Sequence, residues 1–266
     1  MPAKPLKILK VSLLALAGAV VLFVCVGSAL LWMASSQPVQ YAPVQLTPAQ
    51  QDESMHEFVY RIQEFGNQTG VGQPFSWSLT QEQINSYIAS MDAIDALAHG
   101  ATHPSEQLKR LGFSSPTVVL HEGYLTLMVY LDRQDKVASA DVAIEYDRDG
   151  NVRAAVRALR IGLVQVPESV WMQKWQHVQQ EVAQRLASTD GADAGGAGPI
   201  GGISAGAMGK MLSRVLDMLQ GKYVRPEVVW PVGRQHVLID QVKLEEGKLT
   251  IHTAPLNPAS STQPGQ

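Results

Sequence analysis

Cysteine is almost absent from this chain: Cys25 is the only one in 266 residues. No disulfide can form within the chain and no thiolate metal site can be built, so stability must come from side-chain packing. Cys25 follows Leu22-Phe23-Val24, without the small residue just before it that lipoprotein processing needs. We therefore interpret it as a buried apolar thiol.

Clusters of basic residues are also missing. The formal net charge is −3, and no stretch gathers Lys and Arg into a stripe. Nucleic-acid-binding domains carry such a basic footprint, so nucleic acid is not an expected partner.

Charge disappears altogether between Val11 and Met33. About 20 apolar residues in a helix cross the hydrocarbon core of a bilayer, and this run is long enough. Lys4, Lys7 and Lys10 precede it, whereas the next basic residue is Arg61. The positive-inside rule then puts residues 1–10 in the cytoplasm. The sequence predicts a single-pass signal anchor at 11–33 in the cytoplasmic (inner) membrane, with the C-terminal domain outside the cytoplasm.

The alternative is a cleavable secretory signal, whose apolar region usually spans about 7–15 residues. The run here is longer and ends in bulky residues, Leu30-Leu31-Trp32-Met33. Ala34-Ser35-Ser36 remains a possible cleavage site. We favour a retained anchor.

Beyond the anchor the pattern predicts an α+β domain at 47–252, reached by a Pro/Gln/Ser-rich stalk at 34–46. Capping-box patterns at Thr47 and Thr80 announce two helices. A long helix is expected from Pro167, and another amphipathic helix over 208–219. The Gly/Ala-rich stretch 189–207 predicts a flexible linker, and residues 253–266 a disordered tail.

Alternating apolar residues and turn signals predict strands in the middle of the chain and at its end. The expected architecture is a curled antiparallel β-sheet packed against several amphipathic helices. Gly150 is expected at positive φ in a hairpin turn. The predicted strands are Thr117–Leu120, Tyr124–Leu131, Val137–Tyr146, Val152–Ile161, Glu227–Trp230, Val237–Leu244 and Lys248–His252.

Catalytic motifs are weak. Ser204 lies in a G-x-S-x-G pattern, but that motif needs a strand before the serine, and a Gly/Ala run precedes it here. His99 and His103 are spaced for one helix face, yet Gly100 and Pro104 interrupt that helix. No catalytic residue, cofactor or metal site is predicted, and an enzyme, such as a hydrolase, is the least favoured class.

Apolar residues suggest a different kind of site. The strand at 124–131 is apolar on both faces, so it must be covered on both sides or line a greasy pocket. Two tryptophans and a Met-rich helix add adaptable surface, although ordinary packing on the sheet is the alternative for them. The candidate surface for an apolar ligand or partner is Trp171, Trp175, Met208, Met211, Tyr124, Met128 and Tyr130.

Three short segments carry a family resemblance: 78–85 (SLTQEQIN), 161–169 (IGLVQVPES) and 242–249 (VKLEEGKL). In this order, behind an N-terminal anchor, they resemble the YpmS-like family of membrane-anchored bacterial proteins of uncharacterised function. The linker and the stalk depart from that pattern, and the family brings no catalytic residues to transfer. The helix-plus-sheet pattern is also similar to tubular extracytoplasmic lipid-binding domains, an analogy of fold alone.

These observations predict a non-catalytic envelope protein, held at the membrane by one N-terminal span, that binds lipid or another apolar ligand near the membrane surface. A structural or scaffolding module for protein partners in the envelope is the alternative.

Overall fold

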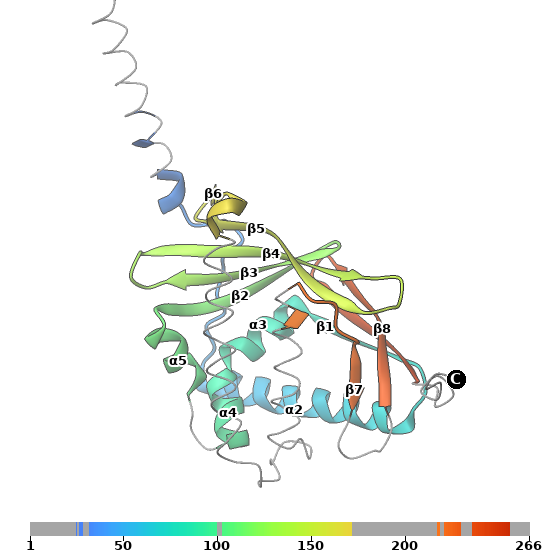
Figure 1. Cartoon of the computed structure of the whole chain (residues 1–266). Coiled ribbons are helices and arrows are strands. Elements are labelled where there is room, and N and C mark those ends of the chain that lie inside the picture. Colours follow the sequence, from blue (N-terminus) through green and yellow to red (C-terminus); the bar gives the residue numbers. More distant parts are fainter. Residues whose placement is uncertain are drawn as a thin grey trace, which may run out of the picture.

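The structure is a computed structural model, which describes residues 25, 27–28, 32–99, 103–171, 217–218, 221–229 and 236–255. The fold is α+β, as predicted, with two antiparallel sheets and several helices (Figure 1).

The first sheet is a meander in the order β2-β3-β4-β5-β6. Its strands confirm the four predicted in the middle of the chain, because alternation and turn residues are strong local signals. Gly150 has φ 76° in the turn between β4 and β5, as expected. The bounds are β2 Phe113–His121, β3 Tyr124–Leu131, β4 Lys136–Tyr146, β5 Val152–Ile161 and β6 Val164–Gln165.

The second sheet has the order β1-β9-β8-β7 and joins distant parts of the chain. Its C-terminal strands were predicted: β7 Glu227–Val229, β8 His236–Glu245 and β9 Lys248–Pro255. Strand β1, Phe75–Thr80, was not, and it pairs with β9 from Phe75–Thr253 to Thr80–Lys248. The second sheet therefore gains its fourth strand where β1 meets the C-terminal hairpin.

The prediction of one curled sheet is wrong: there are two sheets, and neither is curled. The reason lies at the outer edge of β2, where side chains of helix α3 occupy the place of a neighbouring strand. Asn85 bonds Val118 and Gln81 bonds the Leu120 N–H. A strand edge satisfied in this way cannot take the C-terminal hairpin as a further strand.

Two of the four helices begin at strong local signals of the sequence. The capping boxes at Thr47 and Thr80 are both formed, with Gln50 and Gln83 as partners. The first helix ends at Val71, and Gly72 is its left-handed C-cap at φ 69°. The bounds are α2 Pro48–Val71, α3 Gln81–Ala89, α4 Met91–His99 and α5 Pro104–Arg110.

The main core lies where both sheets meet α3. Val118 and Leu120 of β2 are buried against Leu244 of β8. Ile84 and Ile88 pack on them from α3. Val119, the residue between Val118 and Leu120, belongs to a separate cluster on the opposite face of the first sheet. The candidate functional site lies on this second face.

No helix among the described residues is long and apolar enough to cross a membrane. The predicted anchor at 11–33 lies almost entirely outside those residues, as do the linker at 189–207 and most of the predicted tail. The helix predicted from Pro167 is described only to Trp171, and the one at 208–219 only at Asp217 and Met218.

Candidate functional site

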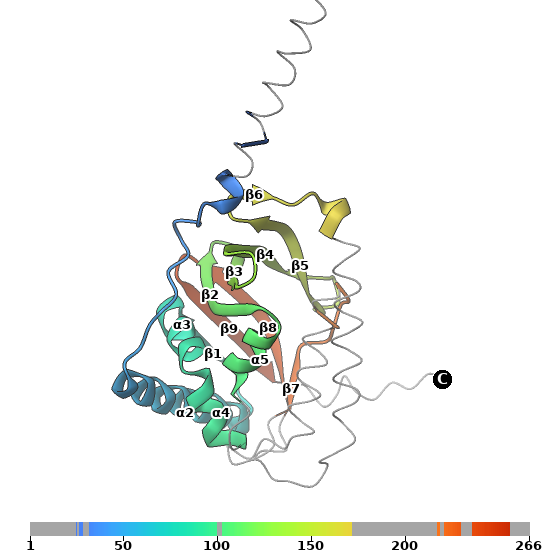
Figure 2. The same ribbon diagram turned by 90° about the vertical axis from the view of Figure 1, so that its left-hand side faces the viewer.

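The segment predicted as a stalk lies along the first sheet. We call residues 32–46 the N-terminal strap; it starts beside β6 and descends past the sheet toward α2 (Figures 1 and 2). At its upper end the Leu163 N–H donates to the Met33 carbonyl at 3.0 Å. Further along, the Tyr41 hydroxyl donates to the Ser115 carbonyl at 3.0 Å. The strap is therefore joined to both edges of the sheet.

Gly162 permits the upper contact. It adopts φ 58°, and a Cβ placed on it would lie 2.7 Å from the Met33 carbonyl oxygen and closer still to that of Ala34. Glycine is the residue that tolerates both a left-handed backbone and such close approach. The "Ile-Gly-Leu" of the 161–169 segment thus makes room for the strap.

A pocket of 390 Å³ lies between the strap and the second face of the first sheet. Pro38, Val39 and Gln40 form one wall. The sheet supplies the rest, from the β2–β3 turn to the turn after β5: His121, Tyr124, Thr126, Met128, Ser139, Asp141, Arg160, Gly162 and Leu163. We call this cavity the strap pocket.

An ion pair forms the polar floor of the strap pocket. Arg160 donates to the two carboxylate oxygens of Asp141 at 2.8 and 2.6 Å. Thr126 Oγ1 donates to the same carboxylate at 2.9 Å. Burial raises the pKa of Asp141, but these hydrogen bonds and the charge of Arg160 outweigh it, so the pKa lies below its ordinary value. Asp141 is therefore held as an anion whose oxygens are well occupied.

Aromatic rings flank this ion pair. The rings of His121 and Tyr124 stack with centroids 4.5 Å apart and planes 18° from parallel. His121 Nδ1 lies 3.9 Å from Glu246, an exposed carboxylate outside the pocket lining. The pocket lining therefore combines hydrogen-bonding groups and aromatic rings with the thioether of Met128, which is buried.

Next to the pocket, Tyr41 anchors the strap in an apolar cluster. It packs against Val119, Met128 and Val137, together with Tyr130. Burial raises the pKa of Tyr41, and its bond to Ser115 lowers it in part. Tyr41 thus combines apolar contact with a hydrogen bond, as buried tyrosines usually do.

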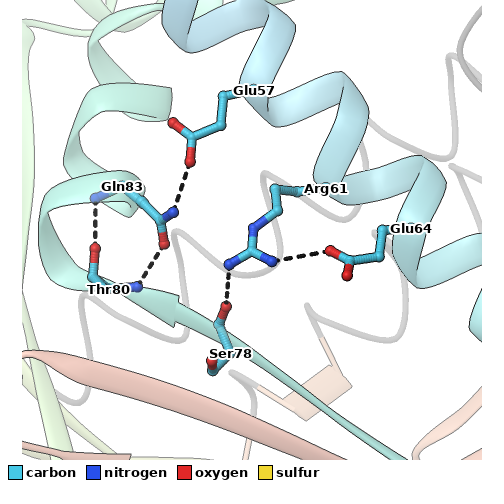
Figure 3. A network of polar contacts seen from close by, with 6 residues as sticks. All are labelled: Glu57, Arg61, Glu64, Ser78, Thr80 and Gln83. Atoms are coloured by element: carbon cyan, nitrogen blue, oxygen red, sulfur yellow. Dashed lines mark hydrogen bonds and ion pairs between the residues drawn. The ribbon is translucent and has the colours of Figure 1, made fainter.

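A second charged cluster lies between α2 and the β1–α3 junction (Figure 3). Arg61 donates to Glu64 and to the Ser78 carbonyl, at 2.9 and 3.2 Å. The Gln83 amide bridges to Glu57 at 2.7 Å while its oxygen accepts from the Thr80 N–H. These groups satisfy one another and hold α2 against α3, so their role is structural.

Beside that cluster, the ring of Tyr87 packs edge-on against Phe58 at 5.2 Å. Its hydroxyl is buried and makes no hydrogen bond among the described residues. Burial and the charge of Glu57 raise the pKa of Tyr87 to about 12. A hydroxyl that stays protonated at neutral pH has no role as a base here.

The predicted surface residues have different places. Tyr124 and Met128 line the strap pocket, and Tyr130 lies in the adjoining cluster with Tyr41. Trp171 is half-buried at the end of the described part of the Pro167 helix. Trp175, Met208 and Met211 lie outside the described residues. The structure therefore brings three of the seven together.

The residues weighed for catalysis form no site among the described residues. Ser204 is outside them. His103 is exposed, just before α5, and only the backbone of His99 is described. Within the described part of the chain no group of three His, Cys, Asp or Glu side chains could hold a metal ion.

The ion pair of the strap pocket was not predicted from the sequence, although the sequence contains a signal for it. Asp141 interrupts the apolar strand Val137–Tyr146, and Arg160 lies in the strand expected to pair with it. An ionisable residue within a strand buried on both faces needs a partner. The pairing of β4 with β5 sets Ser139 opposite Arg160, two residues from Asp141.

Comparisons with known proteins found no relative: no family model, no curated protein and no solved structure matches this chain.

Proposed function

We propose that this chain is a non-catalytic, membrane-anchored envelope protein that binds a lipid by its head group in the strap pocket. The proposal joins the predicted span at 11–33 to the described contacts that follow it.

The observation that carries the proposal is the hydrogen bond between Met33 and Leu163. Met33 is the last residue of the predicted span, and Leu163 lines the strap pocket. With residues 11–33 in a bilayer, the pocket lies directly at the membrane surface. A lipid head group is the ligand available in quantity at that place.

Pocket size favours the head group over the whole lipid. Ligand pockets usually span about 300–1,000 Å³, so a cavity of 390 Å³ is at the small end. Acyl chains do not fit such a space beside a polar head. The proposed mode of binding leaves the chains in the bilayer while the head group enters between the strap and the sheet.

Lipid analysis of the full-length protein tests the proposal. The chain would be purified in a maltoside detergent, extracted and analysed by mass spectrometry for lipid retained at about one per protein. Ser139→Leu, which fills the buried floor of the pocket, should lower the retained lipid severalfold. Ser76→Leu, at an exposed serine of β1, is the matched control. Equal retention in all three proteins would show that the lipid is bound elsewhere, and no retained lipid would contradict the proposal.

A scaffolding role is the second candidate, and one observation favours it. Leu163 and Val170 leave 46% and 52% of their surface exposed. Exposed apolar side chains can mark contact sites for other proteins. Photocrosslinking from position 170 in intact cells would capture a protein if this role is correct, and lipid alone if the pocket carries the function.

The resemblance to the YpmS-like family stays a prediction. Its three segments have structural roles here: Gln81, Gln83 and Asn85 make hydrogen bonds, Gly162 admits the strap, and Gly247 closes the β8–β9 turn.

A further inference from the structure

We infer that the strap pocket recognises an anionic phosphate group, a phosphate monoester or diester, through Arg160 with Tyr124 and His121. The inference rests on the proposed function and deepens it, since it names the chemistry of the head group.

First, the carboxylate of Asp141 already has hydrogen-bond partners. It accepts from two guanidinium nitrogens and from Thr126. It is the only carboxylate among the residues that line the pocket. A cationic or amine head group would therefore find a single carboxylate, already neutralised by Arg160, and would lie beside the positive charge of that guanidinium.

The second step is the donor capacity that Arg160 keeps. A guanidinium has five N–H donors and no acceptor, and two of them are directed at Asp141. Its side chain is 35% exposed and lines the pocket. Arg is the residue whose planar donors match phosphate oxygens. Asp141 holds this group in position and uses only two of its five donors, so three remain for a ligand.

The third step is the pair of rings. Tyr124 and His121 line the same pocket. Each side chain can donate a hydrogen bond, and neither donates to Asp141. Stacking fixes the two rings relative to each other, which reduces the entropy lost when a ligand binds. Three donors from β2, β3 and β5 thus converge beside a carboxylate that is already paired.

A second Arg–carboxylate pair of the same sheet lies outside the strap pocket. Arg153 binds Glu145 at 2.7 and 3.0 Å, also across β4 and β5. That pair lies against Tyr223, with the guanidinium 4.8 Å from the ring centroid, and lines none of the described pockets. It provides a control of the same chemistry outside the strap pocket.

Binding measurements on the full-length protein in a maltoside detergent test the inference. The probes are dihexanoylphosphatidylglycerol, dihexanoylphosphatidylcholine, glycerol 3-phosphate and inorganic phosphate, followed by native mass spectrometry and calorimetry. We expect phosphatidylglycerol to bind about tenfold more tightly than phosphatidylcholine. Both carry the phosphodiester, but the choline ammonium group would be repelled by the positive charge of Arg160.

Variants assign the effect to residues. Arg160→Gln should weaken phosphatidylglycerol binding about tenfold or more, whereas Arg153→Gln should leave it within about twofold. Tyr124→Phe keeps the ring and removes one donor, so about a threefold to tenfold loss is expected. Tyr130→Phe, whose hydroxyl bonds Asp135 outside the pocket, is its control. If Arg160→Gln does not fold, the Tyr124 pair decides.

These measurements distinguish a failure of phosphate recognition from a failure of the proposed lipid binding. Lipid binding that is unchanged in Arg160→Gln and Tyr124→Phe would overturn phosphate recognition while leaving lipid binding intact. Binding of neither lipid, with no lipid retained from the cell, would overturn the proposed function itself. Inorganic phosphate or glycerol 3-phosphate binding as tightly as phosphatidylglycerol, and lost in Arg160→Gln, would support phosphate recognition and identify a soluble source.

Discussion

The side-chain amide of Asn85 makes two hydrogen bonds of 2.8 Å with the backbone of Val118, one as donor and one as acceptor. It thereby imitates a neighbouring strand at the edge of β2, and the Gln81 side-chain oxygen accepts from the Leu120 N–H two residues further along. Asn85 is buried, at 7% exposure. The helix start "T-Q-E-Q-I-N" therefore closes the edge of the first sheet.

Asn85→Ala should lower the free energy of unfolding by about 2–3 kcal/mol, because it leaves a buried N–H and a buried carbonyl of Val118 without partners. Urea unfolding followed by circular dichroism measures this. Asn67, exposed on α2, is the matched control: Asn67→Ala should be neutral or slightly stabilising, since alanine is the better helix former. Similar losses at both positions would show that the bonds to Val118 contribute little.

Gly162→Ala should loosen the strap. The added methyl meets the carbonyls of Met33 and Ala34, and the left-handed backbone adds strain. We expect faster protease cleavage between residues 34 and 46 and a loss of about 2 kcal/mol in stability.

Gly123→Ala separates the two causes. Gly123 also has positive φ, at 78°, but nothing lies within 4 Å of an added Cβ. It should therefore show the backbone strain alone, with cleavage of the strap unchanged. Equal cleavage in the two variants would contradict a close contact between Gly162 and the strap.

Because Asp141 pairs with Arg160, the stability of the folded protein should depend on pH in the acidic range. The pKa of Asp141 is lower in the folded protein than its value of about 3.9 in an unfolded chain. Its contribution is then fully present above about pH 4, and is lost as the pH falls through the folded pKa. Asp141→Asn should be less stable than the parent at pH 6, with the difference in melting temperature shrinking toward pH 3.

Asp149→Asn is a control for that titration, because Asp149 lies in the exposed turn between β4 and β5. Its difference from the parent should be small at pH 6. A difference at position 141 that stays constant from pH 6 to pH 3 would show that the carboxylate charge does not matter.

Tyr41→Ala should detach the lower part of the strap. The ring is half-buried against Val119, Met128 and Val137, so we expect a loss of about 2 kcal/mol. Tyr60, with 67% of its surface exposed, is the control, and Tyr60→Ala should cost less than about 0.5 kcal/mol. Tyr41→Phe isolates the bond to Ser115, at about 1 kcal/mol. Chemical denaturation of the parent and the three variants ranks these values.

Local signals predicted much of the fold. The capping boxes at Thr47 and Thr80 involve residues three positions apart, and the turn at Gly150 needs only a glycine at positive φ. Such features depend on neighbours in the chain, so they can be read from it. Strand β1 could not, because six residues between two helices form a strand only when β9 is there to pair with them.

The candidate site was predicted only in part, for the same reason. Tyr124 and Met128 were selected because their strand is apolar on both faces, and they do line the strap pocket. Asp141 and Arg160 meet through the register of two strands. No local pattern reports a register of that kind.

The sequence by itself determined the elements, their order and the uncharged run that predicts an anchor, since each of these depends on short-range propensity or on composition. Only the tertiary structure decided that two sheets form, that Asn85 closes one of them, and that Pro38, Val39 and Gln40 cover a paired Asp141 and Arg160. These relationships join residues far apart in the chain, and packing in three dimensions selects among the many pairings that local propensity allows.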